Sequence, residues 1–236
     1  MMRSASGRNF PLSTPAPPRQ HSRVPVVSYI IVAVVGYLLG SIPTGYLVAR
    51  ARGIDIRTVG SKNMGATNVF RTLGKGPGIF VLFVDALKGF AASAWFADGC
   101  LRLFNQANPD PQASHIIAGI AAVLGHNYTC WLQFKGGKGI ATTAGVFLAL
   151  APAAVGIAIG LWVIAFVATR YVSIASILAA VALPVAVWFT QENLALRIIA
   201  IILSSLAIYK HKANIQRLMD GTENRIQFNK KPEAAK

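Results

Sequence analysis

The chain has 236 residues, of which 54% are hydrophobic and only 13% are charged, whereas a soluble domain carries about 25% charged residues. Lysine and arginine total 23 against 8 acidic residues, a net charge of +15. This composition excludes a soluble nucleic-acid-binding protein and indicates an integral membrane protein with basic loops.

Seven apolar segments follow a polar beginning. Residues 1–24 are rich in Pro, Ser and Arg and are expected to form a disordered N-terminal tail. Two of the segments are shorter than the roughly 20 residues of a full crossing, so they depend on burial within a bundle. Membrane spans are expected at 24–49, 77–99, 114–133, 139–151, 153–169, 172–190 and 194–209.

These segments predict an all-α integral membrane protein, a bundle of about seven transmembrane helices. Residues 25–215 form the transmembrane domain, and 216–236 form a basic C-terminal tail. Seven crossings place the basic loop at 50–75, the turn at 135–138 and the C-terminal tail on one face. Because inner loops carry the excess of positive charge, we expect that face to be cytoplasmic.

A lysine–glycine stretch at 135–143 is the strongest candidate for chemistry. Gly136, Gly137 and Gly139 leave backbone N–H groups unshielded, and Lys138 adds a positive charge among them. Such a stretch is suited to cradle a phosphate. It differs from the Walker A loop, because Gly139 stands where that motif has the Mg²⁺-binding Ser or Thr.

A second stretch of this kind lies at 60–68, within the basic loop. Its arginine neighbours could serve an anion or simply anchor the loop at the lipid headgroups. The candidate binding residues here are Gly60, Ser61, Asn63 and Asn68, with Arg57 and Arg71 on either side.

Two further polar pairs are spaced i, i+3, so each pair shares one helix face. Ser173 and Ser176 begin the sixth expected span, where helix capping or packing is the alternative role. His211 and Asn214 follow the seventh span, where a plain surface pair is the alternative. All these stretches fall on the same expected face.

Other polar residues are expected to be structural. Asp85 and Lys88 lie i, i+3 inside a span, where unpaired charge is expensive, so we expect them to neutralise each other. His126 is expected to be a buried packing or hydrogen-bonding residue. No metal-ligand cluster, Gly-x-Ser-x-Gly elbow or His-x4-Asp motif is present.

The chain resembles the bacterial membrane acyl-phosphate:glycerol-3-phosphate acyltransferases, the PlsY family. The resemblance runs from about residue 28 to 225. One departure is Lys62, which stands where the family often has glycine and makes a positive φ more costly. The matching stretches are 40–43, 60–71, 85–89, 125–126, 134–142, 170–176 and 211–215.

The resemblance implies transfer of a fatty acyl group from acyl phosphate to the 1-hydroxyl of glycerol 3-phosphate, the first acylation step of phospholipid biosynthesis. The products would be lysophosphatidic acid and phosphate. The family implies a multi-pass protein of the bacterial inner membrane, with its site facing the cytoplasm, and neither metal nor cofactor. Membrane lipid and the enzyme that makes acyl phosphate are the implied partners.

Carried onto this chain, the family's functional positions are Ser61, Arg71, Lys138, Ser176, His211 and Asn214. We expect Lys138, His211 and Ser61 to be catalytic. The expected substrate-binding residues are Arg71, Ser176, Asn214, Asn63, Asn68, Gly60, Gly136, Gly137, Gly139, Ser173 and Arg57.

The chemistry agrees with this interpretation, because acyl phosphate is already activated and requires no covalent enzyme intermediate. Either His211 or an oxygen of the donor phosphate could take the hydroxyl proton. We favour the phosphate, since no acidic residue is seen to orient His211. The competing class is a transporter or channel for organic anions, but two similar halves, typical of transporters, are not evident.

Overall fold

The computed structural model describes residues 26–106, 108 and 110–226. The expected tail at 1–24 and residues 227–236 lie outside the described residues. Every regular element in the described ranges is a helix. In chain order they are α1 (Val26–Ser41), α2 (Thr44–Arg50), α3 (Ala66–Leu73), α4 (Lys75–Ala91), a π-helical turn η1 (Ala92–Phe96), α5 (Ala97–Leu103), α6 (Pro111–Asn127), a 3₁₀ turn η2 (Cys130–Leu132), α7 (Ile140–Leu150), α8 (Pro152–Thr169), α9 (Val172–Thr190), α10 (Leu194–Lys210) and α11 (Lys212–Met219).

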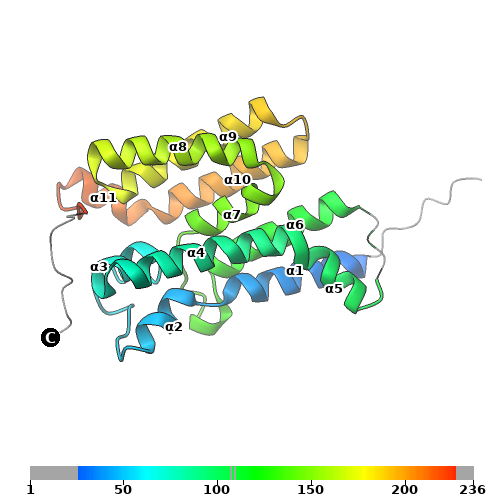
Figure 1. Cartoon of the computed structure of the whole chain (residues 1–236), viewed down its shortest axis with the longest axis horizontal. Coiled ribbons are helices and arrows are strands. Elements are labelled where there is room, and N and C mark those ends of the chain that lie inside the picture. Colours follow the sequence, from blue (N-terminus) through cyan, green and yellow to red (C-terminus); the bar gives the residue numbers. More distant parts are fainter. Residues whose placement is uncertain (1–25, 107, 109, 227–236) are drawn as a thin grey trace, which may run out of the picture.

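The long helices form two groups that lie side by side (Figure 1). Helices α1, α4 and α6 run along one half of the bundle, and α8, α9 and α10 along the other. Helix α7 lies between the groups and packs closely on α4. One buried apolar cluster, which includes Phe147, Val187 and Leu203, joins α7, α9 and α10.

The membrane-spanning segments only partly match the expected seven. Four segments are long and apolar enough to cross a membrane: Val26–Arg50, Lys75–Leu103, Pro152–Thr169 and Val172–Thr190. Helices α10 and α11 add a fifth if the pair, bent by 52°, counts as one span. The count of about seven therefore stays a prediction for the described residues.

Helix α6 differs most from its expected span of 114–133. It begins at Pro111, with Asp110 Oδ1 accepting a hydrogen bond from the Ala113 amide at 3.1 Å, and it ends at Asn127. Beyond it, Gln133 and Phe134 adopt positive φ angles of 55° and 60°. Apart from the turn η2, residues 128–139 therefore form an irregular loop. Such a loop is tolerated at membrane depth only where protein or a wet cavity surrounds it.

Two glycines set the close packing of α4 on α7. A Cβ atom added to Gly145 would lie 1.9 Å from the Ala86 carbonyl oxygen, and one added to Gly89 would lie 2.1 Å from that of Thr142. Both partners are backbone atoms and cannot move aside. Such small residues let membrane helices approach closely, which strengthens their packing.

The expected pairing of Asp85 with Lys88 is confirmed. Their Oδ1 and Nζ atoms are 2.9 Å apart, and each side chain is only 4% exposed. Lys88 Nζ also donates to the Ile42 carbonyl at 3.1 Å, at the break between α1 and α2. The pair therefore ties α4 to the broken first span as well as neutralising its own charge.

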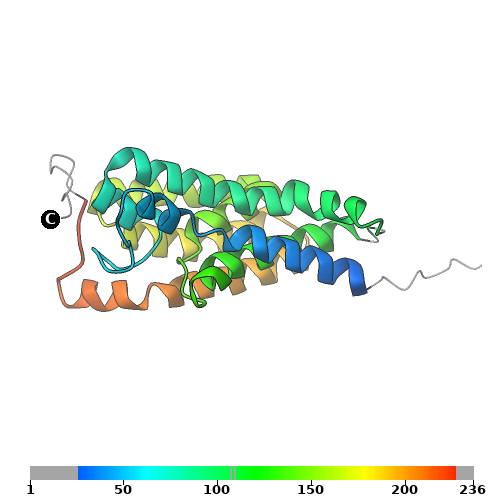
Figure 2. The ribbon, with the colours of Figure 1, turned by 90° about the horizontal axis from the view of Figure 1, so that it is seen from below.

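The irregular and polar segments gather towards one end of the bundle. Helices α3 and α11 lie at that end, and α5 with the turn after it lies at the other (Figures 1 and 2). Lys62, on the loop before α3, adopts a φ of 58° despite its side chain. Lys62 is thus held in a left-handed backbone conformation that glycine would adopt more easily.

The arrangement predicts that Lys62 and Asn105 lie on opposite sides of the membrane. Single cysteines at these positions, in a background lacking Cys100 and Cys130, should react with an impermeant thiol reagent from opposite sides of intact cells. Reaction of both positions from the same side would contradict this arrangement.

Candidate functional site

A cavity of about 760 Å³ opens among α3, α4, α7, α8 and the start of α9. One wall is polar and the other is apolar. The polar wall is formed by Ser61, Asn63, Thr67, Asn68, Arg71, Asp85, His126, Lys138, Ser173, Ser176, His211, Asn214 and Glu223. The apolar wall includes Ile79, Leu82 and Phe83 of α4, Ile140 of α7, and Ile159, Trp162, Val163 and Phe166 of α8.

Asn68 organises the loop that carries Ser61. Its side chain is 1% exposed. Its Nδ2 atom lies within 3.1 Å of the carbonyl oxygens of Ile56, Val59 and Asn63, and its Oδ1 accepts from the Ser61 amide at 2.9 Å. Although Asn68 borders the cavity, its hydrogen-bonding groups are engaged by the loop, so it presents Ser61 to the cavity.

The lysine–glycine loop rests on the end of α6. The amide of Gly136 donates to the Asn127 carbonyl at 3.2 Å, and that of Gly137 donates to the His126 carbonyl at 3.0 Å. These amides are therefore not free to hold an anion, and neither glycine lines the cavity. Lys138 and Gly139 do line it.

Lys138 points to the cavity, where its ammonium donates a hydrogen bond to Asn214 Oδ1. Burial lowers the pKa of Lys138 to about 8, with Glu223 acting against that shift and Arg217 and Arg71 adding to it. Lys135, three residues earlier, is exposed and does not line the cavity. The two lysines of the stretch thus have different surroundings.

His211 and Asn214 lie at the bend between α10 and α11, and both are 4% exposed. His211 Nδ1 is 2.8 Å from the Ala207 carbonyl oxygen. Because a carbonyl can only accept, Nδ1 carries the proton and Nε2 keeps a lone pair. Burial, and then the charge of Lys138, lower the pKa of His211 to about 4.

Glu223 is the charged residue of this cavity that the sequence did not single out. Its Oε1 accepts from Asn214 Nδ2 at 2.8 Å, and its Oε2 accepts from Arg217 Nε at 2.7 Å. Burial alone would raise the pKa of Glu223, but these hydrogen bonds outweigh it and lower the pKa. Its rarity was the available signal, because the chain has only 8 acidic residues.

The chain returns over the cavity after α11. Arg71 Nη2 donates to the Asn224 carbonyl at 2.9 Å, and the Ile226 amide donates to the Arg170 carbonyl at 3.0 Å. Arg71 Nε is buried without a hydrogen-bond partner. Burial lowers the pKa of Arg71, opposed by Glu223. Two residues expected in the C-terminal tail, Glu223 and Ile226, therefore form part of the cavity wall.

Ser173 and Ser176 are buried in the first turns of α9, at the positive end of the helix dipole. Ser176 Oγ accepts from Trp162 Nε1 at 3.2 Å. Trp162 stacks on Phe166 with ring centroids 5.0 Å apart. Ser176 thus lies where the polar wall meets the apolar wall.

Two other expected residues, Gly60 and Arg57, do not line the cavity. Arg57 bonds to Asp55 at 2.7 Å with its side chain 41% exposed, and this bond lowers the pKa of Asp55 to about 2. Gly60 has a φ of 57°, and a Cβ there would lie 2.3 Å from Asn68 Oδ1. The positive φ and the close approach of Asn68 explain why a glycine is needed at position 60.

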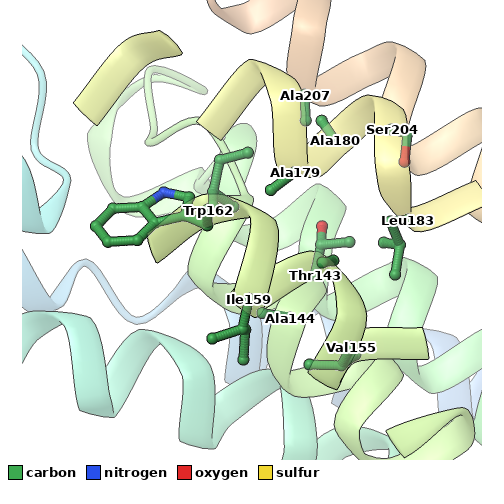
Figure 3. A pocket seen from close by; sticks show the side chains of 12 residues that line it. Thr143, Ala144, Val155, Ile159, Trp162, Ala179, Ala180, Leu183, Ser204 and Ala207 are labelled. Carbon is green, nitrogen blue, oxygen red and sulfur yellow. The ribbon is translucent and has the colours of Figure 1, made fainter. Parts of the chain in front are cut away.

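A smaller cavity of about 80 Å³ lies behind α8. Figure 3 shows Ala179, Ala180 and Ala207 on one side of it and Val155 and Ile159 on the other. Ile159 and Trp162 border both cavities. Within the described part of the chain, no group of three or more His, Cys, Asp or Glu side chains could hold a metal ion.

Comparison with known sequences identifies the family. A family model described as glycerol-3-phosphate acyltransferase matches residues 30–221. The glycerol-3-phosphate acyltransferase of Geotalea daltonii is 45% identical over 199 residues, covering 84% of this chain and 98% of that protein. The enzyme of Geobacter sulfurreducens is 44% identical over 201 residues, covering 85% of this chain and 99% of that protein.

Two solved structures share the fold. Both are crystal structures of PlsY, an integral membrane glycerol 3-phosphate acyltransferase, and each covers 85% of this chain and 96% of the solved one. The glycerol 3-phosphate form has a TM-score of 0.76 at 38% identity, and the lysophosphatidic acid form 0.73 at 37%. The expected all-helical integral membrane fold is thereby confirmed, and the chain belongs to the glycerol-3-phosphate acyltransferase family that includes PlsY.

Proposed function

We propose that this protein transfers a fatty acyl group from acyl phosphate to the 1-hydroxyl of glycerol 3-phosphate, giving lysophosphatidic acid and inorganic phosphate. The observation that carries the proposal is that one cavity, of about 760 Å³, combines a polar wall that includes Lys138 and Arg71 with an apolar wall. Its relatives are glycerol-3-phosphate acyltransferases, and a solved relative has forms named for glycerol 3-phosphate and lysophosphatidic acid. Both proposed substrates carry a phosphate, and only acyl phosphate carries an alkyl chain, so the two together suit such a cavity.

The polar wall supplies positive charge that can offset the negative charge of two phosphates. Lys138 and Arg71 border the cavity. Of the two carboxylates on the polar wall, Asp85 is paired with Lys88, and Glu223 is the one that acts on Lys138 and Arg71. An Arg guanidinium can bind a phosphate through two parallel N–H donors, and a Lys ammonium acts as a compact point charge. We therefore assign Arg71 and Asn214 to glycerol 3-phosphate, and Lys138 to the phosphate that leaves.

The apolar wall suits an acyl chain. Helices α4 and α8 contribute side chains that border the cavity and are exposed on the outside of the bundle, among them Ile79 (59%), Phe83 (65%) and Val163 (47%). In a membrane, such side chains face lipid. An acyl chain can then enter sideways from the bilayer, with its phosphate directed at Lys138.

In the reaction, the 1-hydroxyl oxygen bonds to the carbonyl carbon of acyl phosphate, and the bond from that carbon to the phosphate oxygen breaks. Lys138 stabilises the negative charge that builds on the leaving phosphate. His211 is neutral at pH 7, with Nε2 free to accept a hydrogen bond from the hydroxyl and orient it. With a pKa of about 4, His211 is a weak base, so the phosphate oxygen takes the proton and leaves as hydrogen phosphate.

The distribution of charge supports a cytoplasmic location for the site. The segments with the most basic residues lie at the polar end of the bundle, and inner loops of membrane proteins carry that excess. We place this end in the cytoplasm, at the bacterial inner membrane. An enzyme that makes acyl phosphate would then supply the donor from the same face.

Purified protein should release inorganic phosphate from acyl phosphate when glycerol 3-phosphate is present, with lysophosphatidic acid as the second product. Lys138→Ala should lower turnover by roughly 10²–10³-fold, the usual effect of removing a transition-state donor. Lys138→Arg should also lose most turnover, because a planar guanidinium does not replace a compact ammonium.

Lys135→Ala is the matched control, because Lys135 is exposed and outside the cavity. It should keep near-normal turnover at equal amounts of folded protein, judged by gel filtration. Wild-type protein that forms no lysophosphatidic acid would refute the proposed reaction. Normal turnover in Lys138→Ala would remove Lys138 from it.

The rate should fall as pH rises through about 8. Below its pKa of about 8, Lys138 carries the ammonium that the leaving phosphate needs, and above it the amine is neutral. His211, with a pKa of about 4, should add no step between pH 5 and 8. The measurement is kcat/KM against pH, and a profile that stays flat to pH 10 would contradict this assignment.

Glu223→Ala should lower both the thermal stability in detergent and the turnover. The substitution leaves Asn214 and Arg217 without their acceptor and removes the carboxylate near three cations, at a cost of about 1–3 kcal/mol. Glu223→Gln should lie between, since its carbonyl can still accept from Asn214. The control is Glu192→Ala, in an exposed turn; equal melting temperatures for both alanine variants would contradict the prediction.

A further inference from the structure

His126 lies where three segments meet, and its ring is 4% exposed at the end of α6. On one side, its Nδ1 is 3.6 Å from Asp85 Oδ1 of α4. On the other side lies Gly137, where an added Cβ would be 2.1 Å from His126 Nε2 and 2.7 Å from Cε1. The ring therefore fills the space between the buried Asp85–Lys88 pair and the lysine–glycine loop.

The loop is fastened to the same end of α6 through its backbone. The amides of Gly136 and Gly137 donate to the carbonyls of Asn127 and His126. A Cβ on Gly136 would lie 2.1 Å from the His126 carbonyl oxygen. These contacts leave the loop little freedom, and Lys138 is the next residue.

The His126 ring packs against a fixed ion pair. Asp85 is fixed by Lys88, whose Nζ also bonds to the Ile42 carbonyl. All three side chains, His126, Asp85 and Lys88, are about 4% exposed or less. A side chain packed on such a rigid support can fix the geometry of a site that it does not itself perform chemistry in.

We propose that His126 is a positioning residue: its ring is the surface on which Gly137 rests, and it thereby sets where the Lys138 ammonium meets the leaving phosphate. The proposal rests on the proposed function for its effect on turnover. It explains the glycine at 137 by contact with the ring, and it requires no anion at the Gly137 amide.

The test is a suppressor pair. Gly137→Ala places a methyl group against the ring and should displace the loop, lowering kcat by about 100-fold, the scale expected of a shift near 1 Å. His126→Ala should lower kcat about 10-fold on the same argument. The double variant should recover at least 10-fold over Gly137→Ala, because the methyl group can occupy space left by the ring.

Gly156→Ala, on α8 with nothing within 4 Å of an added Cβ, is the control for a glycine-to-alanine change, and it should keep normal kcat. If Gly137→Ala does not fold, the same comparison applies to the yield of folded protein. A double variant no better than Gly137→Ala, in kcat or in yield, would overturn the proposal and would favour an anion bound at the Gly137 amide.

Hydrogen exchange gives a readout that does not depend on the reaction. Peptides covering 135–139 should exchange slowly in the wild type, faster in Gly137→Ala, and slowly again in the double variant. If this pattern appears in a protein that forms no lysophosphatidic acid, the proposed function fails and the positioning role stands. If exchange in 135–139 is unchanged by Gly137→Ala, the positioning role fails.

Discussion

The arrangement of side chains at the polar end of the bundle keeps the ammonium group of Lys138 charged although it is largely buried. Lys138 donates to Asn214, and Asn214 donates in turn to Glu223, which also accepts from Arg217. The carboxylate is thus one side chain away from the ammonium. A carboxylate at this separation lowers the cost of burying the Lys138 ammonium. It also leaves the ammonium able to bind an incoming anion, whereas a direct lysine–glutamate ion pair would hinder that binding.

The helices were predictable where the chain is uniformly apolar, and less so where contacts distant in sequence set a boundary. The expected spans at 153–169 and 172–190 match α8 and α9 within one residue. Helix α6 ends six residues before its expected limit of 133, because the segment beyond it turns back to bond with its carbonyls. Helix α3 was missed altogether, since its eight residues lie in a basic loop whose apolar side packs on α4.

The site followed a similar division. The two glycine-rich stretches, the i, i+3 spacing of His211 and Asn214 and the family resemblance together drew attention to Ser61, Arg71, Lys138, His211 and Asn214, and the fold brings all of them to one cavity. The glycines were harder to interpret. A glycine that exposes its amide and one that admits a neighbouring side chain look alike in sequence. The structure distinguishes them at Gly137, whose amide bonds to the His126 carbonyl and which lies against the His126 ring. Glu223 was missed because only the return of the chain after α11 brings it to the site.

The apolar wall of the cavity includes side chains of α4 and α8 that are exposed on the outside of the bundle. For a substrate that binds there, the relevant concentration is the one within the membrane. Under the proposed function, an acyl chain bound there would arrive by diffusion within the plane of the membrane, so occupancy would depend on the donor's mole fraction among the surrounding lipids or detergents. Adding detergent at constant total donor would dilute that surface and slow the reaction. The water-soluble acceptor, arriving at the polar end, would keep an ordinary molar dependence.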